Sequence, residues 1–239
     1  LQSVLRQARL SVERWADPAF RVQGLDLLAA ATQAHLQAAG PGSDHQLAFL
    51  RAFAANADSD EYLDVVASIF AGETGVAGLP LDTDLRWSLL SRLATHGRAS
   101  AADIDAELAR DNTAAGRRHA AAVRAALPTA EAKAQAWELV IGRADIHNAE
   151  LASIIGGFQQ PTQLPLLMPY VSRYFDAIAD VWENRTGDTA RTIAEGLFPY
   201  LVIEQSTIDR VDEYLRDRVP APGLRRILLE HRDAIVRAL

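Results

Sequence analysis

The chain has 239 residues, of which 49% are hydrophobic, and it carries a formal net charge of −7 and no cysteine. This composition is typical of a water-soluble globular protein, and the absence of cysteine excludes disulfides and thiolate metal sites. The negative charge argues against nucleic acid as a partner, because the phosphate backbone requires a basic protein surface.

No apolar stretch approaches the roughly 20 residues that a membrane span needs. The first residues, LQSVLRQARLSVERW, lack the apolar segment of a signal peptide. We therefore expect no membrane partner. A cytoplasmic location is the simpler expectation, and the lack of cysteine agrees with it.

Helix-start and helix-stop signals follow one another along the chain. Asp17 before a proline predicts a helix that ends near Gly40, and Ser59 predicts another that ends at Gly72. Ser100 with Asp103 matches a capping box. Further predicted helices start at or near Asp44, Asp82 or Thr83, Asp111 or Thr113, Thr129, Asn148, Pro165, Asp188, Ser206 with Asp209, and Gly223.

Segments with strand-like alternation are hard to find, so almost no β-structure is expected. Helices of about 10 to 20 residues with short loops fit a bundle or an α-solenoid, and the many short helices favour the solenoid. The predicted fold is all-α, an α-solenoid of stacked antiparallel helix pairs similar to a HEAT or armadillo superhelix. The loop over residues 72–80 is the best internal hinge, although it is too short for a domain boundary.

Three prolines stand early in the stretch 158–185, FQQPTQLPLLMPYVSRYFDAIADVWENR. Proline is tolerated in the first turn of a helix but kinks it further on, so this helix is expected to start irregularly, at or just before Pro165. The side chains on its apolar stripe are Leu167, Val171, Tyr174, Ile178 and Trp182. We interpret the aromatic residues mainly as packing residues. The alternative is that the polar tips of Tyr170 or Tyr174 line a cavity.

Catalytic motifs are missing from the sequence. No H-E-x-x-H, G-x-S-x-G or P-loop occurs. His147 and Glu150 have the spacing of a carboxylate-bridged metal site, but such sites need several converging ligands, and a loop histidine beside a helix start is favoured. The acids at helix starts are interpreted as caps that complement the helix dipole, namely Asp58, Asp60, Glu61, Asp103 and Asp105.

One ordered set of short motifs is more specific. It consists of Leu85-Arg86-Trp87, Asp111-x-Thr113-x-x-Gly116, Pro128 followed by Lys133 and Trp137, and F-Q-x-P-x-Q-x-x-L, P-Y-x-x-x-Y-F and W-x-x-R between Phe158 and Arg185. In order and spacing this set resembles the C-terminal helical domain of the zinc aminopeptidase N family, particularly its actinobacterial branch, and the related endoplasmic-reticulum aminopeptidases. The resemblance is strongest over residues 85–199.

The motif residues also have purely structural interpretations. Arg86 can anchor its helix through an acid on a neighbouring helix. Lys133 and Trp137 are four residues apart, so the ammonium can lie near the indole ring.

The resemblance implies that residues 1–239 are a single helical C-terminal domain of a larger aminopeptidase. In that family the zinc ligands, the catalytic glutamate and the G-x-M-E-N segment lie in a preceding thermolysin-like domain. None of these motifs occurs here, so this chain is expected to hold no cofactor and to be inactive alone. Zinc would belong to the parent enzyme, which removes N-terminal residues from peptides. The expected partners are the catalytic domain of the same parent chain and peptide substrates.

Two hypotheses about function stay open. In the first, the chain closes the substrate chamber of the aminopeptidase and controls peptide access and positioning. In the second, it is a free-standing α-solenoid scaffold that binds a protein or peptide in its groove. An independent enzyme is disfavoured because no catalytic constellation is present. If a peptide carboxylate is bound, arginine is its natural partner. The candidate substrate-binding residues are Tyr170, Arg173, Tyr174, Arg185 and Arg191.

Overall fold

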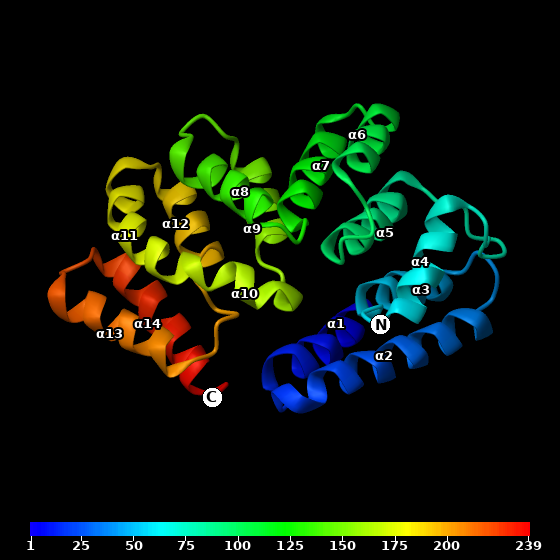
Figure 1. The fold of residues 1–239 in the computed structure, drawn as a ribbon, viewed down its shortest axis with the longest axis horizontal. Helices are drawn as coiled ribbons and strands as arrows, with labels where there is room; N and C mark the ends of the chain where they lie inside the picture. Colours follow the sequence, from blue (N-terminus) through cyan, green and yellow to red (C-terminus); the bar gives the residue numbers. More distant parts are fainter. The chain divides into compact units, whose positions relative to one another are not determined.

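The computed structural model describes residues 1–239, except for the side chain of Pro18. Within the described residues the chain forms fourteen α-helices and no β-strand, apart from an isolated bridge between Val76 and Leu79. The predicted all-α class is confirmed. The chain divides into two compact units, Leu1–Asp111 and Asn112–Leu239 (Figure 1). The superhelical arrangement and the single domain over residues 1–239 stay predictions.

The helices are too short or too polar for a lipid bilayer. Over the part of the chain that the structure describes, none combines the length and the apolar character that crossing a membrane requires.

The first unit contains six α-helices and one π-helical turn. They are α1 (Gln2–Leu10), η1 (Ser11–Trp15), α2 (Pro18–Ala38), α3 (Asp44–Asn56), α4 (Asp60–Ala71), α5 (Thr83–Thr95) and α6 (Ala101–Arg110). The longest helix, α2, packs along α3, and α3 in turn contacts α5. The core of this unit is centred on Leu50, Phe53, Val66 and Leu89, none of which reaches solvent.

Arg86 on α5 connects three helices of the first unit, because it contacts α6 and α4. Its Nε and Nη2 donate to the two carboxylate oxygens of Glu107 on α6 at 2.8 and 2.7 Å, and its Nη1 donates to the carbonyl of Phe70 at 3.3 Å. The expected anchoring of this helix by an acid on a neighbouring helix is therefore confirmed. The adjacent Trp87 donates its indole N–H to Asp111 at 2.9 Å.

The second unit contains eight α-helices and a short 3₁₀ turn. They are α7 (Ala114–Ala126), α8 (Ala130–Gly142), α9 (Asn148–Phe158), η2 (Pro161–Gln163), α10 (Leu164–Leu167), α11 (Pro169–Asn184), α12 (Gly187–Gly196), α13 (Gln205–Asp217) and α14 (Pro222–Val236). The proline-rich stretch does start irregularly, because η2, α10 and α11 each begin at or beside a proline. The prolines sit where their missing N–H groups cost little.

Most predicted helix starts agree with the structure to within a residue, but several capping groups differ. The cap of α3 is Ser43, whose hydroxyl accepts from Gln46 N, rather than Asp44. The residue before α9 is His147. The capping box predicted at Ser206 and Asp209 is wrong: Glu204 precedes α13, and the carboxylate of Asp209 accepts from the Gln205 side chain instead. The capping box at Ser100 is confirmed.

Lys133, the only lysine of the chain, lies fully buried in the second unit. Its Nζ donates to the carbonyl oxygens of Ala125 at 2.7 Å and Phe158 at 3.0 Å, in the last turns of α7 and α9. The ring near the ammonium is that of Phe158, at 5.6 Å, whereas the spacing predicts Trp137. The hydrogen bonds to these two carbonyl oxygens explain why the amine lies at the ends of α7 and α9. Burial lowers the pKa of Lys133 to about 7.

Candidate functional site

The two tyrosines of the predicted site lie in the core of the second unit. Tyr170 is 8% exposed, and its ring packs 5.1 Å from Trp137 and 5.0 Å from Phe158. Tyr174 is 1% exposed and donates its hydroxyl to the carbonyl of Ala194 at 2.8 Å. The observed role of both side chains is packing, and a role in binding substrate stays a prediction.

The three predicted arginines have different surroundings. The Arg173 guanidinium lies over the ring of Tyr170 at 5.1 Å and is exposed. Arg185 donates to the carbonyls of Arg143 at 2.6 Å and Ile141 at 2.5 Å, so it holds the end of α8. Arg191 is exposed on α12. The structure therefore brings Arg173 and Tyr170 into contact, while Arg185 is occupied by backbone acceptors.

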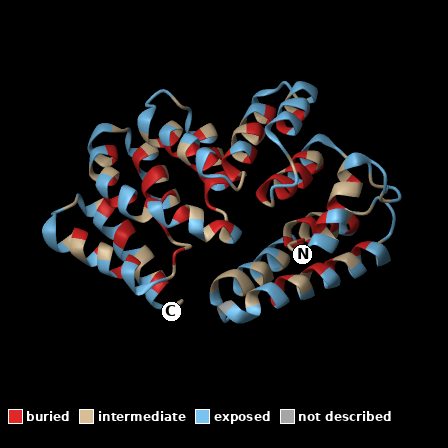
Figure 2. Cartoon of the chain, in the orientation of Figure 1, coloured by how far each residue is buried: buried red, intermediate tan, exposed pale blue. Residues whose placement is uncertain are grey.

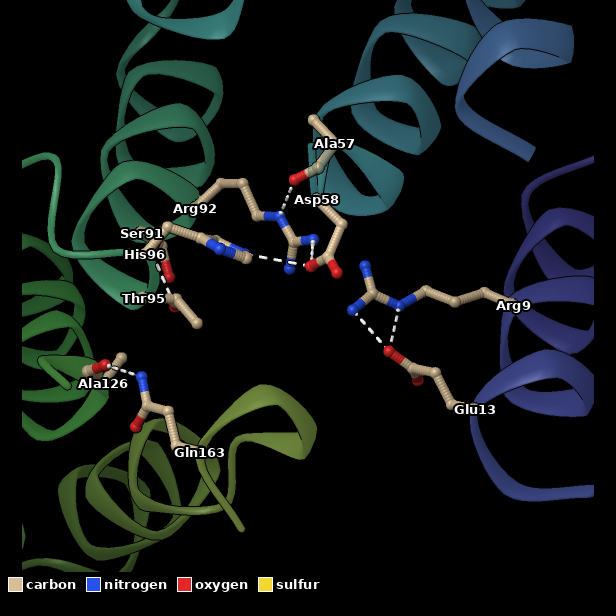
Figure 3. Close-up of polar contacts among 10 residues, drawn as sticks. All are labelled: Arg9, Glu13, Ala57, Asp58, Ser91, Arg92, Thr95, His96, Ala126 and Gln163. Atoms are coloured by element: carbon tan, nitrogen blue, oxygen red, sulfur yellow. Dashed lines mark hydrogen bonds and ion pairs between the residues drawn. The ribbon is translucent and has the colours of Figure 1, made fainter. Parts of the chain in front are cut away.

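A group of polar side chains that the sequence does not single out occurs in the first unit (Figure 3). Arg92 is 8% exposed and donates from Nε to the carbonyl of Ala57 at 2.6 Å and from Nη2 to Asp58 Oδ1 at 2.9 Å. His96 Nε2 lies 3.3 Å from the same oxygen but is not in hydrogen-bond geometry. These contacts attach α5 to the loop that follows α3.

The local sequence explains how this group forms. Arg92 and His96 are four residues apart and lie on the side of α5 that carries the buried Leu85 and Leu89. An arginine on a buried helix face requires an acceptor. Asp58 supplies it from just before the cap of α4. The interpretation of Asp58 as a helix cap is therefore incomplete, because its carboxylate pairs with Arg92.

Burial sets the protonation states of this group. Desolvation lowers the pKa of His96 to about 4, and the neighbouring positive charge of Arg92 contributes to this shift, so His96 is neutral at pH 7. Desolvation also lowers the pKa of Arg92 to about 10, with a contribution from Arg9, while Asp58 opposes the shift. Arg92 therefore stays charged at neutral pH.

An open groove of about 470 Å³ lies between α1 and α3 in the same unit. Three arginines line it, namely Arg6, Arg9 and Arg51, together with alanines of α3. Arg9 pairs with Glu13 through Nε at 2.8 Å and Nη2 at 2.6 Å, as Figure 3 shows. Among the described side chains, the buried Nε of Arg51 is one of the few atoms that lack a hydrogen-bond partner.

This groove has the chemistry of an anion-binding site with an apolar floor. Two of its guanidinium groups, Arg6 and Arg51, form no ion pair among the described residues. Guanidinium groups bind carboxylates through paired N–H donors. The volume lies within the range of about 300–1,000 Å³ that is common for ligand pockets. We therefore take the groove of Arg6, Arg9 and Arg51 as the candidate functional site.

Sequence reasoning missed this site for an identifiable reason. Arg6 and Arg9 lie on a helix with no buried residue, where arginines are ordinarily solvated. The one signal in the sequence, an arginine in the apolar repeat Leu85, Leu89, Arg92, marks the group of Asp58, Arg92 and His96 rather than the groove. Among the described residues, no three His, Asp or Glu side chains are placed to hold a metal ion.

Two comparisons with known proteins bear on the identity of the chain. The family model described as "ERAP1-like C-terminal domain" matches residues 1–237. Aminopeptidase N of Streptomyces lividans is 46% identical over all 239 residues of the chain. The match covers 28% of that relative and falls in its C-terminal part. The chain thus spans under a third of the length of the curated relative.

Proposed function

The chain belongs to the family of ERAP1-like C-terminal domains, and from that premise we propose that it is the non-catalytic C-terminal domain of a zinc aminopeptidase. In this proposal the parent enzyme removes N-terminal residues from peptides. The domain closes the substrate chamber, controls which peptides enter and positions the end of the peptide that does not react. Zinc and the catalytic residues belong to the preceding catalytic domain.

One observation carries the proposal. The 46% identity to the C-terminal part of an aminopeptidase N extends over the whole chain, while the chain has neither H-E-x-x-H nor G-x-M-E-N. A domain that is retained without catalytic groups contributes through binding. Binding energy from remote parts of a substrate can orient the reacting end.

The groove of Arg6, Arg9 and Arg51 is a means of such binding. A peptide carries a carboxylate at its C-terminus, and acidic side chains supply more. Either can accept from the unpaired guanidinium groups, and the alanines of α3 can contact the adjoining apolar part of the peptide. In this proposal a small aminoacyl amide, which has no distal part, does not extend to the groove.

The test uses the parent enzyme and compares two substrates. Arg51→Met is expected to lower kcat/KM for a peptide of six or more residues about tenfold, which corresponds to loss of one charge-assisted hydrogen bond of about 1.5 kcal/mol. Hydrolysis of a small chromogenic aminoacyl amide should not change. Arg110→Met, which removes an exposed arginine outside the groove, should change neither rate. Equal losses on both substrates in a folded, zinc-loaded Arg51→Met enzyme would contradict the proposal.

Two further variants of the same assay test the remaining site prediction and the domain role. If Arg173, Arg185 and Arg191 contact the peptide, single alanine replacements should lower peptide turnover more than amide turnover. Loss of the backbone contacts of Arg185 alone would lower both rates equally. Removal of residues 1–239 should reduce peptide turnover far more than amide turnover. Folding and zinc content of the truncated enzyme must be measured first, because removing a helical domain exposes apolar surface.

A further inference from the structure

Helix α2 is apolar on two opposite sides. On one side Leu25, Ala29 and Leu36 are buried against the rest of the first unit. On the other side the exposed residues are Phe20, Leu27, Ala31, Ala34 and Ala38. Their spacings of seven, four, three and four residues place them on one stripe of the helix. We call this stripe the outer face of α2.

The outer face has the composition of a buried surface. Its polar neighbours in helical register are Gln23 and His35, and it carries no Asp, Glu, Lys or Arg. An apolar stripe on a helix ordinarily faces a packing partner, so a helix with two such stripes is expected to be covered on both. Figure 2 shows buried and exposed residues side by side along α2.

Exposed apolar side chains concentrate in the same part of the chain. Of the twelve exposed large hydrophobic side chains among the described residues, seven lie within residues 1–27. They include Val4, which is 68% exposed, Val22 at 65%, Leu27 at 57% and Trp15 at 50%. Two of the seven, Phe20 and Leu27, lie on the outer face of α2, and a water-soluble protein rarely exposes large apolar groups together without a partner.

The length of the relative indicates which partner covers this surface. The chain matches only the C-terminal part of the Streptomyces aminopeptidase N, so most of that polypeptide precedes the matched part. In arrays of stacked helices the terminal units need a polar outer face. The outer face of α2 is apolar instead, as expected for a helix inside such an array.

We propose that the outer face of α2 is the docking surface for a helix of the parent polypeptide that precedes this domain. The inference rests on the proposed function only in taking the chain as part of a longer protein. From Phe20 to Ala38 the face extends about 27 Å at 1.5 Å per residue, so the partner is an amphipathic helix of about 18 residues. The small side chains of Ala31, Ala34 and Ala38 allow a close approach of the two helices.

Thiol labelling tests the proposal, and the absence of cysteine from residues 1–239 makes a single introduced cysteine easy to follow. Ala34→Cys reports on the outer face, and Ala102→Cys, at an exposed position of α6, is the matched control. In the native parent protein, Ala34→Cys should be alkylated at least tenfold more slowly than Ala102→Cys. In residues 1–239 alone, the two rates should agree within threefold. Peptide mapping by mass spectrometry separates these sites from cysteines elsewhere in the parent.

A photocrosslinker attached to the introduced thiol of the Ala34→Cys variant identifies the partner. The crosslinked peptide should come from the polypeptide that precedes residue 1. Crosslinks to residues 112–239, or rapid alkylation of Ala34→Cys in the parent, would overturn the proposal. Protection in the isolated chain that disappears on dilution would also overturn it, because a second copy would then cover the face. Since no readout depends on peptide hydrolysis, failure here is distinct from failure of the proposed function.

Discussion

Replacing one of two adjacent glycines of α9 is expected to damage the second unit, while replacing the other should not. A Cβ at Gly157 would lie 1.9 Å from the carbonyl oxygen of Ala122 on α7. It would also lie 2.8 and 3.0 Å from the carbonyl carbon and the Cα of the same residue. All three are backbone atoms, which cannot rotate away. A Cβ at Gly156 would have no neighbour within 4 Å.

The size of the clash sets the expected loss of stability. Ordinary contact begins at 3.4 Å, so α9 would have to retreat from α7 by about 1.5 Å, the difference between 3.4 and 1.9 Å. Gaps of about 0.5–1 Å already forfeit a quarter to a half of the dispersion energy of the atoms concerned. We expect Gly157→Ala to lower the free energy of unfolding by about 3 kcal/mol, at the upper end for overpacked sites. Gly156→Ala should raise it by about 0.5–1 kcal/mol, because alanine is favoured over glycine inside a helix.

Urea denaturation followed by circular dichroism at 222 nm measures both variants in residues 1–239. The difference between the two neighbours should be about 4 kcal/mol, the sum of the two expected effects. If Gly157→Ala stayed within about 1 kcal/mol of the unmodified chain with an unchanged denaturant slope, the close approach of α7 and α9 would be refuted.

Two further predictions concern buried charges. Lys133 has a folded-state pKa of about 7 against about 10.4 unfolded, so between these values the unfolded chain binds more protons and stability rises with pH. Relative to Lys133→Met, the unmodified chain should gain about 3 kcal/mol between pH 7 and pH 10 in urea titrations; a difference independent of pH would show that Lys133 titrates normally. Arg86→Met should cost about 3 kcal/mol or more, because it leaves the Glu107 carboxylate buried without its two donors. Arg98→Met, which removes exposed ion pairs with two aspartates, should cost less than about 1 kcal/mol, and equal losses in the two arginine variants would contradict the argument.

Local signals predicted much of the secondary structure. Asp17, Asp82, Thr113 and Thr129 cap helices as their positions in the sequence suggest. A cap depends only on a side chain and an N–H two or three residues further on, so the necessary information lies within one turn of chain. The failure at Ser206 shows the limit, because several polar residues beside one another offer alternative local pairings.

The family resemblance was also contained in the sequence, since the order and spacing of short motifs such as Leu85-Arg86-Trp87 are properties of the chain alone. The candidate site was not. The three groove arginines come from α1 and α3, which are separated by the whole of α2, and no spacing rule relates them. Likewise, the predicted Arg185 had the right chemistry to bind a carboxylate, but the structure shows it occupied by two backbone carbonyls.

The chain by itself therefore determined which segments are helical, where most of them start, and that no metal or nucleophile motif is present. Only the tertiary structure decided which side of each helix has a partner. Gly156 and Gly157 are identical in type and adjacent in sequence, yet one faces open space and the other touches the α7 backbone. The reason is geometric: successive residues of an α-helix point about 100° apart, so the neighbouring helix, rather than the residue type, determines which glycine is required.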